Sequence, residues 1–212
     1  MNLDIYQRKL VDLLKEKGIQ DARVLAAFAK IPRHRFVDEA LAQDAYKDNA
    51  LPIGNSQTIS QPYVVAGMTQ ALRLGKDDKI LEIGTGSGFQ AAVLAEFSRR
   101  VYTVERDPQL AEKARKRLRE MGYQNIMIKV GDGSMGWVAN APYDRIIVTA
   151  GATESVPESL LKQLADGGRM IIPTGDRKRQ ELLLIQRRGN EYSSEKLGSV
   201  VFVPLIGKEG WH

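Results

Sequence analysis

The sequence predicts an α/β protein whose doubly wound, mostly parallel sheet has helices on both faces. From residue 79 onward, short apolar runs alternate with helix-like segments, which is typical of parallel strands joined by crossover helices. The chain has 212 residues. This exceeds the usual domain of roughly 100–150 residues but lies within the size of one elaborated α/β domain. We therefore expect one core with an appendage.

The segment before the sheet predicts that appendage. Apolar residues recur at helical spacing between Ile5 and Leu14, and Asp21 can cap a second helix that runs through Phe28. Residues 48–62 contain two prolines, a glycine and several small polar residues, which indicate a loop. Helical spacing resumes at Pro62. We expect N-terminal helices, then a loop, then a further helix that leads into the sheet.

Seven apolar runs predict the strands. Five of them alternate with helix-like segments and should pair in parallel; they occupy residues 79–84, 100–105, 125–131, 144–150 and 169–173. Two further runs, residues 181–188 and 199–207, are separated by a segment too short for a helical crossover. This spacing predicts that the seven-stranded sheet includes an antiparallel C-terminal strand pair.

Composition excludes several classes of protein. The absence of cysteine excludes disulfides and thiol catalysis, and the two histidines, His34 and His212, lie too far apart in sequence to suggest a metal site. No apolar run approaches the ~20 residues that span a bilayer, and the N-terminus lacks the pattern of a secretory signal. A net charge of +5 permits a nucleic-acid partner, but we interpret the basic clusters at 114–120 and 176–180 as solvated surface. We expect a cytoplasmic protein without a metal site or a membrane contact.

A glycine loop marks the candidate ligand site. Gly84, Gly86 and Gly88 follow the first strand and precede a helix, where missing side chains let the backbone approach a ligand. A structural turn alone would need only one glycine. A nucleotide-triphosphate loop is excluded, because no lysine follows Gly88 before the helix.

A dinucleotide site is the main rival interpretation of this loop. Gly86, Gly88 and Ala91 fit the pattern G-x-G-x-x-A, and Glu105 ends the next strand where a ribose-binding acid would lie. Spacing alone does not separate the two interpretations. However, 78 residues precede the first strand and no Tyr-x-x-x-Lys pair supplies a proton donor. Glu82, a carboxylate near the end of a buried strand, instead suggests a ligand ammonium group nearby.

The set of an acid, three alternating glycines and a second acid resembles the S-adenosylmethionine-dependent methyltransferases and their Rossmann-like fold. The resemblance implies that Glu82 and residues 84–88 surround the methionine part of the cofactor, while Glu105 binds the ribose hydroxyls. It also implies that Asp132 faces the adenine amino group and that Gly133 contributes backbone contacts. For Asp132, a plain turn residue remains the alternative.

The whole chain is similar to the protein-L-isoaspartate O-methyltransferase family. Seven ordered blocks carry this similarity: residues 31–37, 51–60, 81–90, 131–137, 141–150, 156–175 and 200–207. An Asn-Pro-Pro-Tyr-like motif, usual in enzymes that methylate base nitrogens, is absent after the fourth strand, where "VTAGA" stands. The chain departs from the common family pattern at Asn55, Ser56 and Tyr63, on the rim of the expected substrate groove.

The resemblance implies roles for particular residues. Ser60 matches the active-site serine, although a serine two residues before Pro62 could instead cap a helix. Gln180 matches a glutamine near the cofactor or substrate. The expected cofactor-binding residues are Thr58, Ile59, Glu82, Gly84, Thr85, Gly86, Ser87, Gly88, Glu105, Arg106, Asp132, Gly133 and Gln180.

It also implies the reaction, which transfers a methyl group to the free α-carboxylate of an L-isoaspartyl residue in a damaged polypeptide. The ester then collapses to a succinimide, which allows repair. A carboxylate with a reference pKa of about 3.3–4.3 is already a nucleophile at neutral pH, so the reaction needs no general base. Ser60 would orient that carboxylate, and residues 48–62 would form a lid and groove wall.

We expect one methyltransferase domain over residues 1–212. Residues 1–75 would hold the helices and substrate loop, residues 76–175 the cofactor-binding core, and residues 176–212 the C-terminal strands. A monomer without a nucleic-acid partner is expected. Two alternatives remain, namely a methyltransferase that acts on RNA or a small molecule, and a cofactor-binding protein without turnover.

Overall fold

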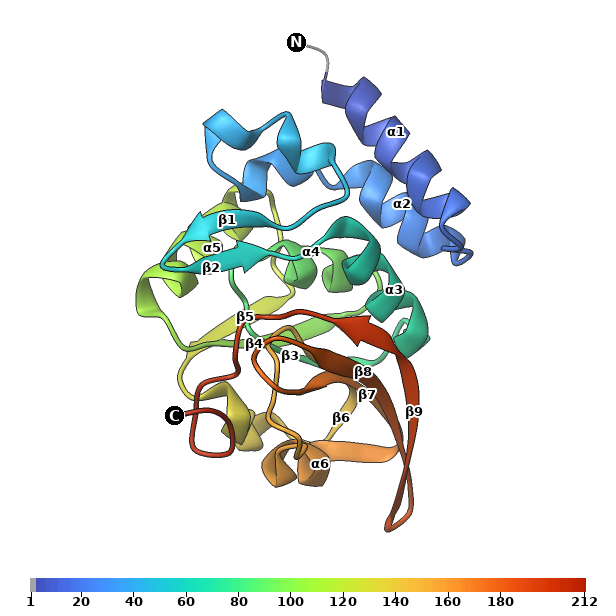
Figure 1. Ribbon diagram of the computed structural model, residues 1–212, viewed down its shortest axis with the longest axis vertical. Coiled ribbons are helices and arrows are strands. Elements are labelled where there is room, and N and C mark those ends of the chain that lie inside the picture. The colour runs from blue at the N-terminus through green and yellow to red at the C-terminus, as the bar shows by residue number, and fades with distance from the viewer. Residues whose placement is uncertain (1–2) are drawn as a thin grey trace.

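The computed structural model describes residues 3–212, and a seven-stranded sheet runs through its centre in the order β5-β4-β3-β6-β7-β8-β9 (Figure 1). These strands are β3 (Lys79–Ile83), β4 (Arg100–Glu105), β5 (Ile126–Val130), β6 (Tyr143–Val148), β7 (Leu164–Gly175), β8 (Gln180–Arg188) and β9 (Glu191–Val200). Strands β3 to β7 pair in parallel, whereas β7, β8 and β9 pair antiparallel. The predicted fold class is therefore confirmed.

Helices cover both faces of this sheet. They are α1 (Leu3–Glu16), α2 (Ala22–Lys30), α3 (Pro62–Leu72), α4 (Phe89–Ala95), α5 (Pro108–Glu120) and α6 (Glu158–Gln163). Alternate residues of β3 face opposite sides: Ile80 packs in one buried cluster with α1 to α4, and Leu81 packs in a second cluster with Leu160 of α6. This alternation follows from the period of two in a strand.

The N-terminal helices pack as the predicted appendage. The side chain of Asp21 accepts a hydrogen bond from the backbone nitrogen of Arg23 and caps α2, as the sequence predicts. Gln7, buried on α1, donates to the carbonyl oxygens of Phe28 and Ile31 at 2.7 and 2.9 Å, which ties α1 to the end of α2. These contacts fix the appendage above the sheet (Figure 1).

The order of the strands reverses at β3. The chain runs outward from β3 through β4 to β5, then returns to place β6 on the other side of β3. In open parallel sheets, ligands bind in the crevice at such a switch point, outside the carboxyl ends of the strands. The topology therefore places a site where β3, β4 and β6 end.

The expected loop at 48–62 contains a short hairpin. Strands β1 (Leu51–Gly54) and β2 (Gln57–Ile59) pair antiparallel, and the turn residues Asn55 and Ser56 have φ angles of +50° and +55°. Asparagine tolerates this left-handed conformation, which suits the turn of a tight hairpin. The prolines and small polar residues concealed the hairpin in the sequence.

The alternative role of Ser60 as a helix cap is wrong. Helix α3 begins at Pro62, and its N-cap is Gln61, without a hydrogen bond from any side chain.

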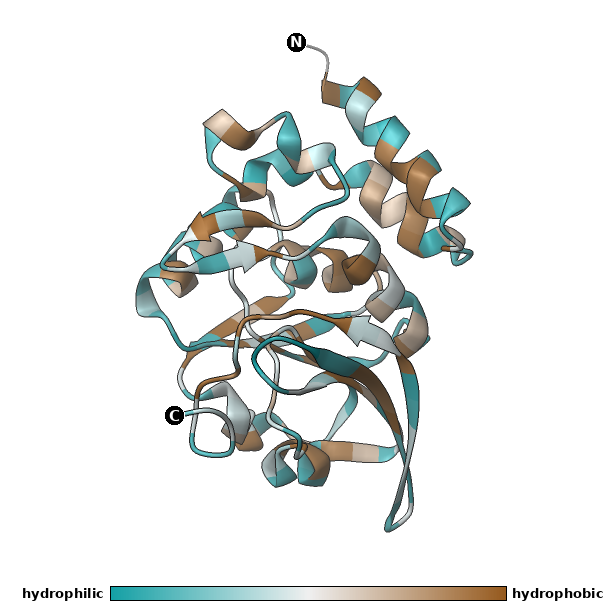
Figure 2. Cartoon of the chain, viewed as in Figure 1, coloured by the Kyte–Doolittle hydropathy of each residue, from teal (hydrophilic) through white to brown (hydrophobic). Residues whose placement is uncertain are grey.

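The prediction that the last strand occupies residues 199–207 is also wrong. Strand β9 is Glu191–Val200, and β8 and β9 form a long hairpin that turns at Gly189. Residues 191–199 are all exposed, so β9 lacks the apolar alternation that would reveal it, and Figure 2 shows its hydrophilic colouring. The apolar residues at 201–207 instead cover the end of the sheet, where the backbone nitrogen of Leu205 donates to Gly151.

Candidate functional site

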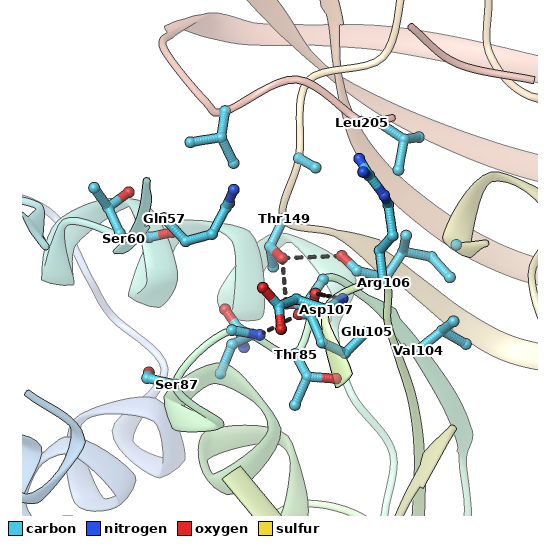
Figure 3. A pocket seen from close by; sticks show the side chains of 18 of the residues that line it. Gln57, Ser60, Thr85, Ser87, Val104, Glu105, Arg106, Asp107, Thr149 and Leu205 are labelled. Atoms are coloured by element: carbon cyan, nitrogen blue, oxygen red, sulfur yellow. Dashed lines mark hydrogen bonds between the residues drawn. The ribbon is translucent and has the colours of Figure 1, made fainter. Parts of the chain in front are cut away.

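A cavity of about 800 Å³ opens at the carboxyl ends of β3, β4 and β6. Its wall combines the glycine loop, the turn after β4, the β1–β2 hairpin and the C-terminal segment. Figure 3 shows Thr149 in the middle of this wall, with Gln57 and Ser60 to one side and Arg106 and Leu205 to the other. The predicted site residues that line it are Thr58, Ile59, Ser60, Gly84, Thr85, Gly86, Ser87, Glu105, Arg106 and Gly133.

The glycine loop exposes backbone without side chains to this cavity at Gly84 and Gly86. Gly84, Gly86 and Gly88 have φ angles of +96°, +51° and +90°, which side-chain-bearing residues rarely adopt. A Cβ atom on Gly84 would also clash with Thr149 Oγ1. Gly88 does not line the cavity; a Cβ atom there would lie 3.2 Å from Leu118, so this glycine permits close packing of α4 against α5.

Side chains hold the glycine loop from several directions. Thr149 Oγ1 donates to the carbonyl oxygen of Gly84 at 2.7 Å, and the hydroxyls of Thr85 and Thr103 lie 2.6 Å apart. Arg117 Nη1 donates to the carbonyl oxygen of Ser87 at 2.7 Å. Arg117 belongs to the basic cluster at 114–120, so this member of the cluster supports the loop rather than facing solvent.

Glu105 connects the glycine loop to the next turn. Its Oε2 accepts a hydrogen bond from the backbone nitrogen of Gly86 at 2.8 Å, and its Oε1 accepts from that of Asp107 at 2.9 Å. A carboxylate offers about four lone-pair sites. Glu105 thus retains acceptor capacity toward the cavity, as a contact with ligand hydroxyls requires.

Glu82, two residues before Gly84, does not line the cavity. Its side chain is fully buried, and neither carboxylate oxygen has a hydrogen-bond partner among the described residues. Burial, with a smaller contribution from the negative charge of Glu105, raises the pKa of Glu82 to about 8, although the nearby Thr103 hydroxyl acts in the opposite direction. An unpartnered buried acid of this kind is unusual in a folded protein and marks Glu82 as a candidate functional position.

Asp132 also lies outside the cavity wall. Its Oδ1 accepts hydrogen bonds from the backbone and hydroxyl of Ser134, and its Oδ2 accepts from the backbone nitrogen of Lys208 at 2.7 Å. Burial raises the pKa of the Asp132 carboxyl, but these hydrogen bonds outweigh that effect and keep it below the usual value. Gly133 lines the cavity in its place. The contact of Asp132 with an adenine amino group stays a prediction, beside an observed role in fixing the C-terminal segment.

Ser60 lies where the N-terminal appendage meets the cavity. Its carbonyl oxygen accepts from Arg33 Nη2 at 2.7 Å, while Arg33 Nε donates to Ala45 at 2.8 Å. The guanidinium lies 4.7 Å from the ring centre of Phe89, which also lines the cavity. Burial lowers the pKa of Arg33 to about 9, so the side chain stays charged at neutral pH. The Ser60 hydroxyl has no hydrogen-bond partner within residues 3–212.

A second cavity of about 560 Å³ adjoins the first, and Thr58, Ser60 and Thr149 line both. Gln180 lines neither. It is buried, accepts a hydrogen bond from the backbone nitrogen of Phe202 at 2.7 Å and donates to the carbonyl oxygen of Asp176. Gln180 therefore joins two segments that border the second cavity.

Sequence reasoning missed several residues of the site. Thr149 follows a buried strand directly, which is a signal that could have identified it. Asn55, one of the three departures from the family pattern, lines the larger cavity, and its Nδ2 donates to Asp107 Oδ2 at 2.6 Å. This hydrogen bond lowers the pKa of Asp107. Of the other two departures, neither Ser56 nor Tyr63 lines either cavity.

Residues 3–212 bring no three or more metal-binding side chains together in a cluster. None of the helices in this range is long and apolar enough to cross a membrane.

The buried acid predicts a pH-dependent stability. Between the reference pKa of 4.5 and the folded value of about 8, folded Glu82 keeps a proton that the unfolded chain has lost, so stability falls as pH rises. Urea unfolding of the ligand-free protein should show that Glu82→Gln removes this contribution, by about 1.4 kcal/mol for each pH unit within the window. Equal differences between variant and wild type at pH 5 and pH 8 would contradict this account of Glu82.

The chain matches known proteins along almost its whole length. Residues 5–210 match the family model described as protein-L-isoaspartate(D-aspartate) O-methyltransferase. The protein-L-isoaspartate O-methyltransferase 1 of Syntrophobacter fumaroxidans is 55% identical over 93% of this chain and 92% of its own length. The protein-L-isoaspartate O-methyltransferase of Dictyoglomus thermophilum is also 55% identical, over 97% of this chain and 93% of its own.

Solved structures show the same fold. One, named protein-L-isoaspartate O-methyltransferase, is 30% identical with a TM-score of 0.86 and covers 96% of this chain and 67% of its own. Another, from Plasmodium falciparum in complex with S-adenosyl-L-homocysteine, is 24% identical with a TM-score of 0.81 and covers 94% of this chain and 98% of its own. The agreement of family model, sequence relatives and fold means that the chain belongs to the protein-L-isoaspartate(D-aspartate) O-methyltransferase family.

Proposed function

We propose that this chain methylates the free α-carboxylate of L-isoaspartyl residues in damaged peptides and proteins at the junction of its two cavities. S-adenosylmethionine would occupy the larger cavity, and the acceptor would enter through the smaller one. The observation that carries the proposal is that Thr58, Ser60 and Thr149 line both cavities. Donor and acceptor would therefore meet beside Ser60, and the ester formed there would initiate repair.

The larger cavity fits this cofactor. Bare backbone at Gly84 and Gly86 leaves room for a ligand, and Glu105 offers carboxylate acceptors at the end of β4. Glu82, buried near the end of β3 with neither oxygen hydrogen-bonded among the described residues, would become ionised more readily beside a cationic ligand group. When bound, S-adenosylmethionine supplies an electrophilic methyl group on a sulfonium. The individual contacts of Thr58, Ile59, Arg106, Asp132, Gly133 and Gln180 with it stay predictions.

The reaction requires the protein to orient the acceptor carboxylate, and it requires no general base. An α-carboxyl group, with a reference pKa of about 3.3–3.7, is ionised at neutral pH and attacks without proton removal. The Ser60 hydroxyl has no partner among the described residues and is available to donate to this carboxylate. Exclusion of water favours the cancellation of opposite charges along the reaction, and fixed geometry supplies much of the rest.

Other expected properties stay proposals. These are the cytoplasmic location, the monomeric state, the absence of a nucleic-acid partner, and the division at residues 75 and 175. The basic cluster at 114–120 supports the view that RNA is no substrate, because Arg117 serves the glycine loop and Arg115 pairs with Glu112.

An acceptor assay tests the function. The chain should transfer labelled methyl to an isoaspartyl peptide but not to the same peptide with normal aspartate, since only the former presents a free α-carboxylate beside the chain. Bulk RNA should accept no label and should leave peptide methylation nearly unchanged at physiological salt. Methylation of RNA without methylation of the isoaspartyl peptide would overturn the proposal.

Ser60→Ala tests the junction. The variant should lower kcat/KM for an isoaspartyl peptide at least about tenfold, equivalent to roughly 1.4 kcal/mol of transition-state stabilisation. Its free energy of unfolding and its affinity for S-adenosylhomocysteine should stay close to wild type, because Ser60 caps no helix. Ser193→Ala, on exposed β9, is the matched control. Unchanged kcat/KM in Ser60→Ala would remove this serine from the catalytic site.

A further inference from the structure

The loop between β7 and β8 supplies the charged side chains of the smaller cavity, and all of them are positive. Lys178 and Arg179 of this loop both line the cavity, and no aspartate or glutamate does. The remaining wall is polar but uncharged, or apolar; it comprises Ala50, Thr58, Ser60, Gln61, Val64, Thr149 and residues 199–203. The cavity is therefore suited to an anionic group in addition to the apolar parts of a peptide.

This loop is held in a defined shape. Asp176 Oδ1 accepts hydrogen bonds from the backbone nitrogens of Lys178 and Arg179 at 2.6 and 2.8 Å. The buried side chain of Gln180 then joins the carbonyl oxygen of Asp176 to the backbone nitrogen of Phe202, which also lines the smaller cavity. Gln180 thus sets the position of the loop relative to the cavity without entering the cavity itself.

The two arginines that flank Lys178 in this loop already contact other groups of the protein. Arg177 lies 5.1 Å from the ring centre of Trp211 and donates to the carbonyl oxygen of His212. Arg179 donates to Ser199 Oγ at 3.0 Å and lies 3.7 Å from a carboxylate oxygen of Glu181. Lys178 has no ion-pair or hydrogen-bond partner for its ammonium group among the described residues. Its charge acts through space on the carboxylate of Asp176, without an ion-pair contact, and its exposed side chain leaves the ammonium group accessible to a ligand in the cavity.

Lys178 and Ser60 lie at different parts of the smaller cavity. Ser60 also lines the larger cavity, where the methyl group would lie, whereas Lys178 lines the smaller one alone. An acceptor carboxylate at Ser60 would leave Lys178 for another group of the same peptide. The ammonium would then meet a side chain close in sequence to the damaged residue.

We propose that Lys178 is a specificity-determining residue, whose ammonium group binds the carboxylate of an Asp or Glu side chain beside the isoaspartyl residue. This rests on the proposed function and names the acceptors that the site prefers, namely damaged sites in acidic surroundings. Because the ion pair lies at a cavity rim, its effect is modest, about threefold in kcat/KM, and it weakens as salt screens the charges.

Three isoaspartyl peptides that differ only in one flanking residue test the proposal. The flanking residue is Glu, Gln or Lys, and kcat/KM is measured for each at low and at physiological salt. Wild type should favour the Glu peptide over the Lys peptide, with a smaller ratio at higher salt. Lys178→Glu should reverse that order. Lys76→Glu makes the same charge change at the amino edge of the sheet, opposite the cavities, and should keep the wild-type order.

The outcomes distinguish a failure of the proposed specificity of Lys178 from a failure of the proposed function. Retention of the wild-type order in Lys178→Glu would overturn the role of Lys178. A uniform fall for all three peptides would overturn it too, because Lys178 would then contact the acceptor carboxylate that the peptides share. Equal rates for the three peptides with wild type would overturn only the specificity, whereas methylation of none would overturn the proposed function and the specificity with it.

Discussion

The paired hydrogen bonds of the Glu105 carboxylate are the interaction on which the rest of the site depends. One oxygen holds the backbone of Gly86 and the other that of Asp107, so the loops that follow β3 and β4 are fixed to each other. Hydrogen bonds to an ionised acceptor are among the stronger ones in proteins. Asp107, positioned in this way, caps α5 and receives Asn55 from the tip of the β1–β2 hairpin. One carboxylate thereby links the glycine loop and the turn after β4 directly, and the β1–β2 hairpin through Asp107; all three segments line the larger cavity.

Three segments that are distant in sequence complete this frame. Arg33 brings the appendage to the carbonyl oxygen of Ser60, Thr149 connects the end of β6 to the glycine loop, and Leu205 fastens the C-terminal segment to Gly151. Each contact pairs a backbone group that would otherwise be left unpaired in a partly buried place, which is costly. The appendage is therefore part of the site, because it holds the serine at the junction of the two cavities.

The sequence predicted the parts of the molecule that local patterns encode. Buried parallel strands appear as apolar runs, so the parallel core was predicted correctly. The glycine loop has a spacing that little else requires, which made it a candidate ligand site before its place in the cavity wall was known. Strand β9 was missed because an exposed edge strand carries no apolar signal. Other contacts join residues that are far apart in sequence. Asp132 accepts a hydrogen bond from Lys208, 76 residues away, and Gln180 accepts one from Phe202, 22 residues away. No local pattern reports such contacts.

Calorimetric titration with S-adenosylhomocysteine tests the central role of Glu105 most directly. In Glu105→Gln, an amide group replaces one oxygen and faces a backbone N–H, so one loop loses its acceptor. The account predicts that wild type binds S-adenosylhomocysteine and does not bind NAD comparably. It also predicts that the variant remains folded but binds S-adenosylhomocysteine at least about tenfold more weakly, consistent with the loss of a hydrogen bond to a charged group. Unchanged affinity in the folded variant, or tighter binding of NAD by wild type, would contradict it.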